Sequence, residues 1–162
     1  METVRLRARR AGPDDVNSLV RLYRGLETEM TLLHPMWPLA DGLAEPVESS
    51  FKDLLEDPDA IVVIGEIDEY PFGFVVARVE EILPQAEGEK VGSIRLIYVE
   101  SEAREIALGE AMRDYVIGLL REQGISKFDA HVLPGHRLAK NFFEAGGFSA
   151  RAIIMHHDDN KK

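Results

Sequence analysis

Small and charged residues stand together where a strand-like run gives way to a long helical pattern, in the segment Arg104-Glu105-Ile106-Ala107-Leu108-Gly109-Glu110. A helix that begins directly after a strand presents free backbone N–H groups and the positive end of its dipole at that junction. Phosphate groups bind well at such a helix end, and small residues in the first turn let them approach the backbone. The segment therefore predicts a cradle for a diphosphate group.

The elements on either side of this junction are strongly patterned. The apolar, partly β-branched run 94–99 is typical of a buried strand. The helix that follows directs one face to the core, because its apolar residues recur at spacings of three and four: Leu108, Ala111, Met112, Tyr115, Val116, Leu119 and Leu120. Gly124 suits the left-handed residue that commonly follows a helix C-terminus.

The rest of the chain predicts further strands and helices in a mixed α/β order. The expected elements are a strand over 4–8, a helix from Pro13 that fades near Met30, a helix over 47–55, strands over 60–67 and 72–79, a strand over 127–133, a helix over 138–143 and a last strand over 148–155. Because a helix connects 94–99 to 127–133, these two strands are expected to be parallel. We expect a single domain over 1–155 and a polar tail over 156–162.

Composition narrows the classes of function. No run approaches membrane-spanning length, so no membrane partner is expected. The absence of cysteine excludes disulfides, a thiol nucleophile and Cys-ligated zinc, and a cytoplasmic location is expected. The formal charge of −10 argues against a nucleic-acid partner, which requires clustered cations. A terminal run of His156, His157, Asp158 and Asp159 lacks rigid geometry, so no metal site is expected.

Two motifs resemble one known family. The segment 99–112 reads Val99-x-Ser101-x-x-Arg104-x-x-Ala107-x-Gly109-x-Ala111-Met112. It resembles V-x-P-x-x-[RQ]-x-x-G-x-G-x-A-L, the acyl-CoA-binding motif of the GCN5-related N-acetyltransferase (GNAT) family. Two residues depart from the motif: Ser101 replaces the usual proline, and Ala107 replaces the first glycine. Alanine at this position is expected to keep helical backbone angles and to add one methyl group beside the phosphates.

The second motif lies near the C-terminus. His136-x-x-Ala139-x-x-Phe142-Phe143-x-x-Gly146-Gly147-Phe148 resembles the family pattern N-x-x-A-x-x-F-Y-x-x-x-G-F. The order of the expected elements also matches that family. The resemblance implies an acyl-CoA N-acyltransferase fold, in which a mixed, mostly antiparallel central sheet contains a parallel, splayed strand pair and carries helices on both faces.

The resemblance implies transfer of an acetyl group from acetyl-CoA, as co-substrate, to a primary amine of a small molecule or a protein. In the family the pantetheine arm follows the central strand, here Ile97, Tyr98 and Val99, and the N–H of Val99 stabilises the thioester oxyanion. The diphosphate is bound by residues 104–110. His136 either hydrogen-bonds CoA or only opens the helix that follows it.

Two side chains that the family commonly uses for proton transfer are absent. Ser93 stands at the usual position of the general base, and Phe143 at that of the general acid. By residue type alone, three carboxylates are candidates for the general base: Glu100, Glu66 and Glu29. Each of them also suits a solvated surface. We place catalysis at Tyr98, beside the expected thioester, and at Glu100.

The resemblance implies that the loop after the first helix lines the acceptor site. Glu29, His34 and Trp37 are its candidate residues, although Trp37 also suits a cover over the core. Acidic residues around it favour a cationic amine: Glu27, Glu29, Asp41, Glu45 and Glu48. The alternatives are a catalytically silent acyl-CoA sensor or interaction module and a structural domain without CoA affinity. The resemblance is also compatible with a homodimer.

Overall fold

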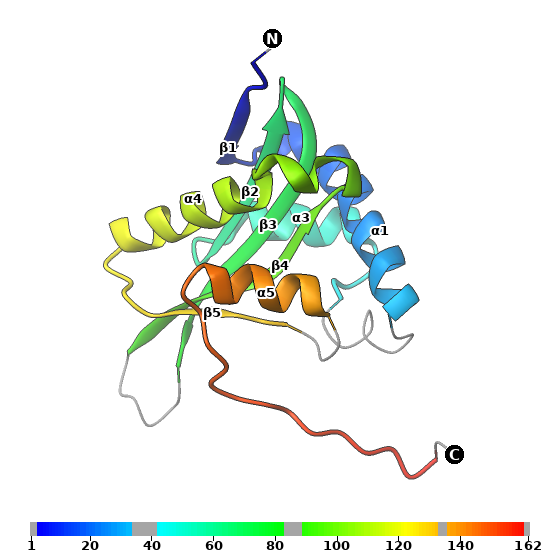
Figure 1. Ribbon diagram of the computed structural model, residues 1–162, viewed down its shortest axis with the longest axis vertical. Helices are drawn as coiled ribbons and strands as arrows, with labels where there is room; N and C mark the ends of the chain where they lie inside the picture. Colours follow the sequence, from blue (N-terminus) through cyan, green and yellow to red (C-terminus); the bar gives the residue numbers. More distant parts are fainter. Residues whose placement is uncertain (1–2, 34–41, 83–88, 133–135, 161–162) are drawn as a thin grey trace.

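A computed structural model describes residues 3–33, 42–82, 89–132 and 136–160 (Figure 1). Along the chain the elements are β1 (Leu6–Arg10), the 3₁₀ turn η1 (Pro13–Asp15), α1 (Val16–Leu33), α3 (Val47–Glu56), β2 (Ala60–Ile67), β3 (Tyr70–Glu81), β4 (Lys90–Val99), the 3₁₀ turn η3 (Ser101–Ile106), α4 (Leu108–Glu122), β5 (Phe128–Ala130) and α5 (Arg137–Ala145). None of the helices described is long and apolar enough to cross a membrane.

The sheet follows the order of the chain, β1-β2-β3-β4-β5. The first three pairs of neighbours are antiparallel, and β4 and β5 are parallel. A register shift between β3 and β4 leaves Arg95 without a residue opposite it, since Val76 pairs with Leu96 and Ala77 with Ile94. The mixed sheet, its parallel pair and the helices on both faces confirm the predicted fold class.

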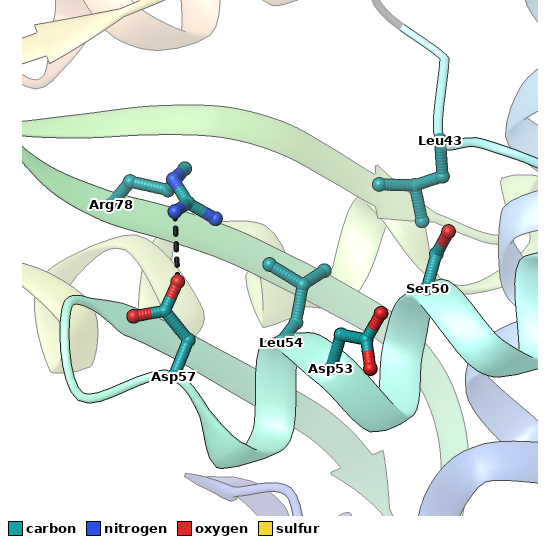
Figure 2. A pocket seen from close by; sticks show the side chains of 6 residues that line it. All are labelled: Leu43, Ser50, Asp53, Leu54, Asp57 and Arg78. Carbon is teal, nitrogen blue, oxygen red and sulfur yellow. Dashed lines mark hydrogen bonds and ion pairs between the residues drawn. The ribbon is translucent and has the colours of Figure 1, made fainter.

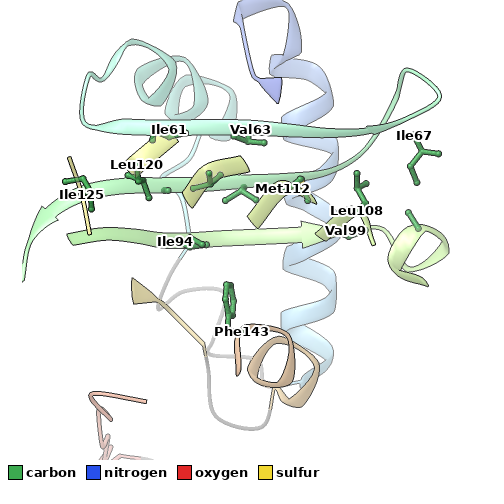
Figure 3. Packing of buried hydrophobic residues seen from close by; sticks show 14 residues of the cluster. Ile61, Val63, Ile67, Ile94, Val99, Leu108, Met112, Leu120, Ile125 and Phe143 are labelled. Carbon is green, nitrogen blue, oxygen red and sulfur yellow. The ribbon is translucent and has the colours of Figure 1, made fainter. Parts of the chain in front are cut away.

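Each face of the sheet carries its own core. Helix α4 covers one face, where Leu108, Met112 and Leu120 pack over strand residues such as Val63 and Ile94 (Figure 3). Helices α1 and α3 cover the other face, where the buried residues include Leu19, Leu22, Phe51, Ile64 and Phe74. The helical spacing in the sequence predicted the buried face of α4 correctly, because burial of the apolar stripe decides how an amphipathic helix docks.

The predicted strand over 148–155 is wrong. These residues form no strand; after Phe148 the chain runs along the outside and away from the domain (Figure 1). Arg151 is tied to β5 by an ion pair, its Nε lying 2.8 Å from Asp129 Oδ1, but Ile154 is 91% exposed. An apolar, β-branched run favours a strand, yet a strand also requires a hydrogen-bonded neighbour. The predicted strand over 127–133 is correct in direction but shorter, Phe128–Ala130.

Arg9 joins the first strand to the start of α1 and to the sheet. Its Nη2 lies 2.8 Å from Asp15 Oδ1, and its Nε lies 3.0 Å from Oε1 of Glu66, which is 8% exposed. Asp15 also accepts a hydrogen bond from the backbone N–H of Gly12 at 2.8 Å. The hydrogen bond from Arg9 is the largest cause that holds the pKa of Asp15 below its usual value. These contacts therefore hold β1, η1 and β2 together.

Candidate functional site

Strands β4 and β5 separate after a short contact. They pair over three residues, from Gly92 to Ile94, and His131 N–H donates to Ile94 O at 3.0 Å. β4 continues to Val99 with β3 on its other edge only. Because Glu100 N–H donates to β3, and backbone groups of neighbouring residues point to opposite edges, those of Val99 and Ile97 are directed away from β3. The described strands thus leave this edge without a strand partner.

The junction between β4 and α4 differs from the sequence prediction in one respect. Ala107, the residue before α4, has φ 61° and ψ 21°, which is the left-handed conformation and not the helical one expected. Its carbonyl accepts the N–H of Ala111 at 3.1 Å, so it closes the first turn of α4. The sequence motif has glycine at this position. Glycine adopts these angles without a steric penalty, whereas the Cβ of alanine makes them unfavourable.

Gly109 lies where three elements approach one another. A Cβ added to it would lie 3.2 Å from the ring of Phe142 on α5 and 3.7 Å from a methyl group of Val99 on β4. Arg113 supports this contact, since its Nη1 donates to Phe142 O at 3.1 Å. The missing side chain at Gly109 therefore serves the packing of α5, in addition to the close phosphate approach expected from the sequence.

Helix α1 presents Gly25 and Glu29, four residues apart on one face, to the end of β4. A Cβ on Gly25 would lie 2.8 Å from the hydroxyl of Tyr98, so the tyrosine packs directly on the helix backbone. One turn later, Glu29 Oε1 lies 2.7 Å from Nη2 of Arg104. Arg104 also donates from Nε to Val99 O at 2.9 Å. The structure thus brings together predicted cofactor, catalytic and acceptor residues.

A second ion pair involves Arg21, which lies one turn before Gly25 on α1. Arg21 pairs with Glu100, donates from Nη2 to Pro71 O at 2.7 Å and lies over the ring of Tyr70, 5.3 Å from its centre. The carboxylate of Glu100, a predicted catalytic group, is thereby engaged by a cation.

Burial shifts the pKa of two groups in this region. Desolvation is the main cause that raises the pKa of Tyr98, and the charge of Glu29 raises it further. Tyr98 therefore stays protonated at neutral pH and can donate a hydrogen bond. Desolvation also lowers the pKa of His136, which precedes α5, while Glu29 opposes this effect and Arg104 adds to it. Its imidazole is therefore neutral at neutral pH.

Ser93 and Phe143 stand where the two common proton-transfer groups were expected, and both lie in the protein interior. Ser93 is fully buried, and its Oγ lies 3.3 Å from Glu80 Oε2. Phe143 is 3% exposed, and its ring packs edge-on against Phe142 and Phe148 at centroid distances of 5.0 and 5.3 Å. Phe143 is accordingly a core aromatic residue.

The remaining predicted residues are placed as follows. Leu108 is fully buried under the sheet, whereas Glu105, Ile106 and Glu110 are exposed beside the junction, where the prediction uses only their backbone groups. Two acceptor-site candidates, His34 and Trp37, lie outside the described residues. Within the described ranges, no three or more His, Asp or Glu side chains gather in a metal-binding arrangement.

A cavity of about 230 Å³ lies elsewhere, between α3 and β3 (Figure 2). Asp57 and Arg78, which form an ion pair at 2.8 Å, are among the residues that line it. The residues that line it are Leu43, Ser50, Asp53, Leu54, Asp57 and Arg78. None of the predicted site residues is among them, so this cavity is separate from the β4–α4 junction.

Gly25 and Arg21 were not predicted as site residues. The sequence did contain a signal for Gly25, because a glycine inside an amphipathic helix costs about 1 kcal/mol relative to alanine and often marks a close approach. No pattern pointed to Arg21, whose partner Glu100 is 79 positions away in the chain.

The family profile described as Acetyltransferase (GNAT) family matches residues 21–148. The chain belongs to the GNAT family. Membership confirms the predicted acyltransferase class and acetyl-CoA as co-substrate. No curated protein matches the chain.

Solved structures share this fold at low sequence identity. The aminoglycoside N-acetyltransferase AAC(6')-Iy, in complex with CoA, has a TM-score of 0.76 at 14% identity, covering 99% of this chain and 98% of that one. A tetramutant of the BH1408 protein from Bacillus halodurans reaches 0.79 at 16% identity, with 94% and 99% covered. Ribosomal-protein-alanine N-acetyltransferase from Brucella melitensis biovar Abortus 2308 reaches 0.69 at 16%, with 96% and 100% covered.

Proposed function

We propose that this GNAT protein transfers an acetyl group from acetyl-CoA to a primary amine of a small molecule or a protein. The observation that carries the proposal is the separation of β4 from β5 directly beside the start of α4. A strand edge without a described strand partner suits the amides of a pantetheine arm, and a helix N-terminus suits the diphosphate. The proposed cofactor-binding residues are Ile97, Tyr98, Val99, Arg104 to Glu110, and His136.

The proposed acyl transfer places the amine on the α1 side of β4. The amine, once deprotonated, attacks the thioester carbonyl, whose oxygen the N–H of Val99 stabilises as it becomes an oxyanion. The C–S bond then breaks, the nitrogen loses one proton as the amide forms, and the thiolate takes up a proton. Tyr98, which stays protonated, is the proposed hydrogen-bond donor beside the thioester, and Glu100 the proposed proton acceptor.

The acceptor is proposed to be a cationic amine that binds beside Glu29, whose carboxylate also pairs with Arg104 at 2.7 Å. Support for a polycation is weaker than the count of acids suggests, because arginines already pair with several of them. Arg24 pairs with both Glu27 and Glu45, at 2.7 and 2.8 Å. Aminoglycoside and ribosomal-protein acetyltransferases share the fold, so both small-molecule and protein amines belong in the assay.

A catalytically silent acyl-CoA sensor is the second candidate. The buried Ser93 and Phe143, at the positions of the usual base and acid, favour it. Two measurements separate the candidates. Acetyl-CoA should raise the melting temperature in both cases, since a ligand that binds only the native state stabilises it. Thiol release with a panel of monoamines, polyamines, aminoglycosides and N-terminal peptides should occur only with the enzyme. No release with any of these amines would favour the sensor, and no thermal shift would exclude both.

A further inference from the structure

The guanidinium of Arg104 is turned toward α1 and the end of β4. It contacts Glu29 through Nη2 and the carbonyl of Val99 through Nε, and its Cζ lies 5.7 Å from the centre of the Tyr98 ring. The side chain of Arg104 is 33% exposed and that of Glu29 is 24% exposed, so both charges are partly withdrawn from water. Arg104 thus has three partners within the protein: a carboxylate of α1, a carbonyl at the end of β4 and the ring of Tyr98.

Two ion pairs of opposite polarity fix α1 against this strand end. On α1, Arg21 and Glu29 flank Gly25 at intervals of four residues, and they pair with Glu100 and Arg104. Because α1 supplies the cation of one pair and the anion of the other, a helix shifted by two turns would bring like charges together. The two pairs therefore hold the helix in one register on either side of the Gly25–Tyr98 contact.

We propose that the Arg104 side chain is a positioning residue for acyl transfer: through Glu29 and the carbonyl of Val99 it fixes α1 to the end of β4, while the diphosphate is held by backbone N–H groups without it. The inference rests on the proposed function for its meaning in catalysis. The sequence prediction used Arg104 for its backbone N–H in the diphosphate cradle and assigned its side chain no role.

The chemistry of the side chain explains why arginine is required. A guanidinium donates in several fixed directions, so it can hold a carbonyl and a carboxylate at once, whereas the single ammonium of lysine holds them less well. If the amine binds beside Glu29 and the thioester beside Val99, this pair of contacts sets the distance between the reacting groups. A misplacement of about 1 Å between reactants can reduce a rate by roughly 100-fold.

The test compares Arg104→Gln, Arg104→Lys, Glu29→Gln and the double variant with the natural protein. Arg24→Gln, which removes an arginine of α1 that has two carboxylate partners, is the matched control. Calorimetry measures the affinity for CoA, and thiol release from acetyl-CoA measures turnover with the most active amine of the panel. Proton NMR measures the pKa of His136, assigned with His136→Gln.

We expect CoA affinity to stay within threefold in every variant. Turnover should fall at least tenfold in Arg104→Gln and in Glu29→Gln, no further in the double variant, and should recover in part with lysine. Since Arg104 lowers and Glu29 raises the pKa of His136, that pKa should rise in Arg104→Gln and fall in Glu29→Gln. The control should change none of these quantities.

Two results would overturn the inference. A tenfold loss of CoA affinity in Arg104→Gln, with Glu29→Gln unaffected, would place the side chain on the cofactor. A His136 pKa that moves in neither variant would show that the pair does not lie at the site. If the natural protein releases no thiol with any amine, the proposed function fails, whereas CoA affinity and the His136 pKa still decide where the Arg104 side chain acts.

Discussion

Replacing Ala107 by glycine should stabilise the protein without disturbing the cofactor site. Ala107 adopts φ 61° and ψ 21°, angles at which the Cβ of an L-residue crowds the following carbonyl. Its side chain is exposed, so removal of the methyl group uncovers no buried surface. The expected gain therefore comes from the backbone alone.

The magnitude follows from two opposing effects. The left-handed conformation costs a residue with Cβ roughly 1–2 kcal/mol. Glycine offsets part of the gain, because its greater freedom in the unfolded chain costs about 0.4–1 kcal/mol. We expect Ala107→Gly to raise the free energy of unfolding by about 0.5–1 kcal/mol. For a domain of this size that corresponds to an increase of about 1–4 °C in melting temperature.

Ala111→Gly is the matched control, four residues further along the same helix. The N–H of Ala111 donates to Ala107 O within α4, so its backbone is helical, and glycine should cost about 1 kcal/mol there. Urea unfolding of both variants gives the comparison, and calorimetry with CoA shows whether the cradle is kept. Affinity for CoA in Ala107→Gly should equal or exceed that of the natural protein.

The two variants should thus move stability in opposite directions. If Ala107→Gly destabilises the protein as much as Ala111→Gly does, Ala107 is helical and the left-handed junction is refuted. A loss of CoA affinity in Ala107→Gly would instead show that the methyl group itself contributes to binding.

Two further predictions concern α1 and the first strand. Gly25→Ala should lower the free energy of unfolding by about 1 kcal/mol and reduce turnover, since its Cβ would lie 2.8 Å from the hydroxyl of Tyr98. Gly118→Ala, with no atom of the described residues within 4 Å of the added Cβ, should raise the free energy of unfolding by about 1 kcal/mol in the same thermal melts. Arg9→Met should lower the free energy of unfolding, measured with urea at pH 7, by about 2 kcal/mol. Because Arg9 lowers the pKa of Asp15 from 3.8, the stability from this pair is present above that value and is lost as pH falls through the lowered folded pKa; a difference that persists undiminished at pH 2 would contradict this origin.

Much of the fold was predictable because it depends on short-range patterns. The apolar stripe of α4 and the β-branched runs of β2 and β4 can be recognised directly in the sequence. The parallel direction of β5 follows from the helix that precedes it. The segment 148–155 shows where this reasoning stops, because an apolar run specifies a strand only if a neighbouring strand edge is within reach.

The strand–helix junction to which the candidate site is assigned was predicted correctly as a structural feature, and its side-chain contacts less well. The turn between β4 and α4 was correctly identified as the junction, but the left-handed angles of Ala107 were not. Gly109 was expected to leave space for a phosphate, and in the structure its missing side chain also leaves space for the ring of Phe142. Such contacts depend on how closely α5 approaches α4, which no local pattern reports.

The sequence by itself determined the family, the elements and the strand–helix junction, because hydrophobic period, turn residues and motif spacing act over a few residues. Only the tertiary structure decided which side chains meet there. Glu29 and Arg104, or Gly25 and Tyr98, are more than 70 positions apart, and they meet only because two faces of one sheet are buried by different helices. The direction of the Arg104 side chain is set by that packing, and with it the chemistry we assign to the site.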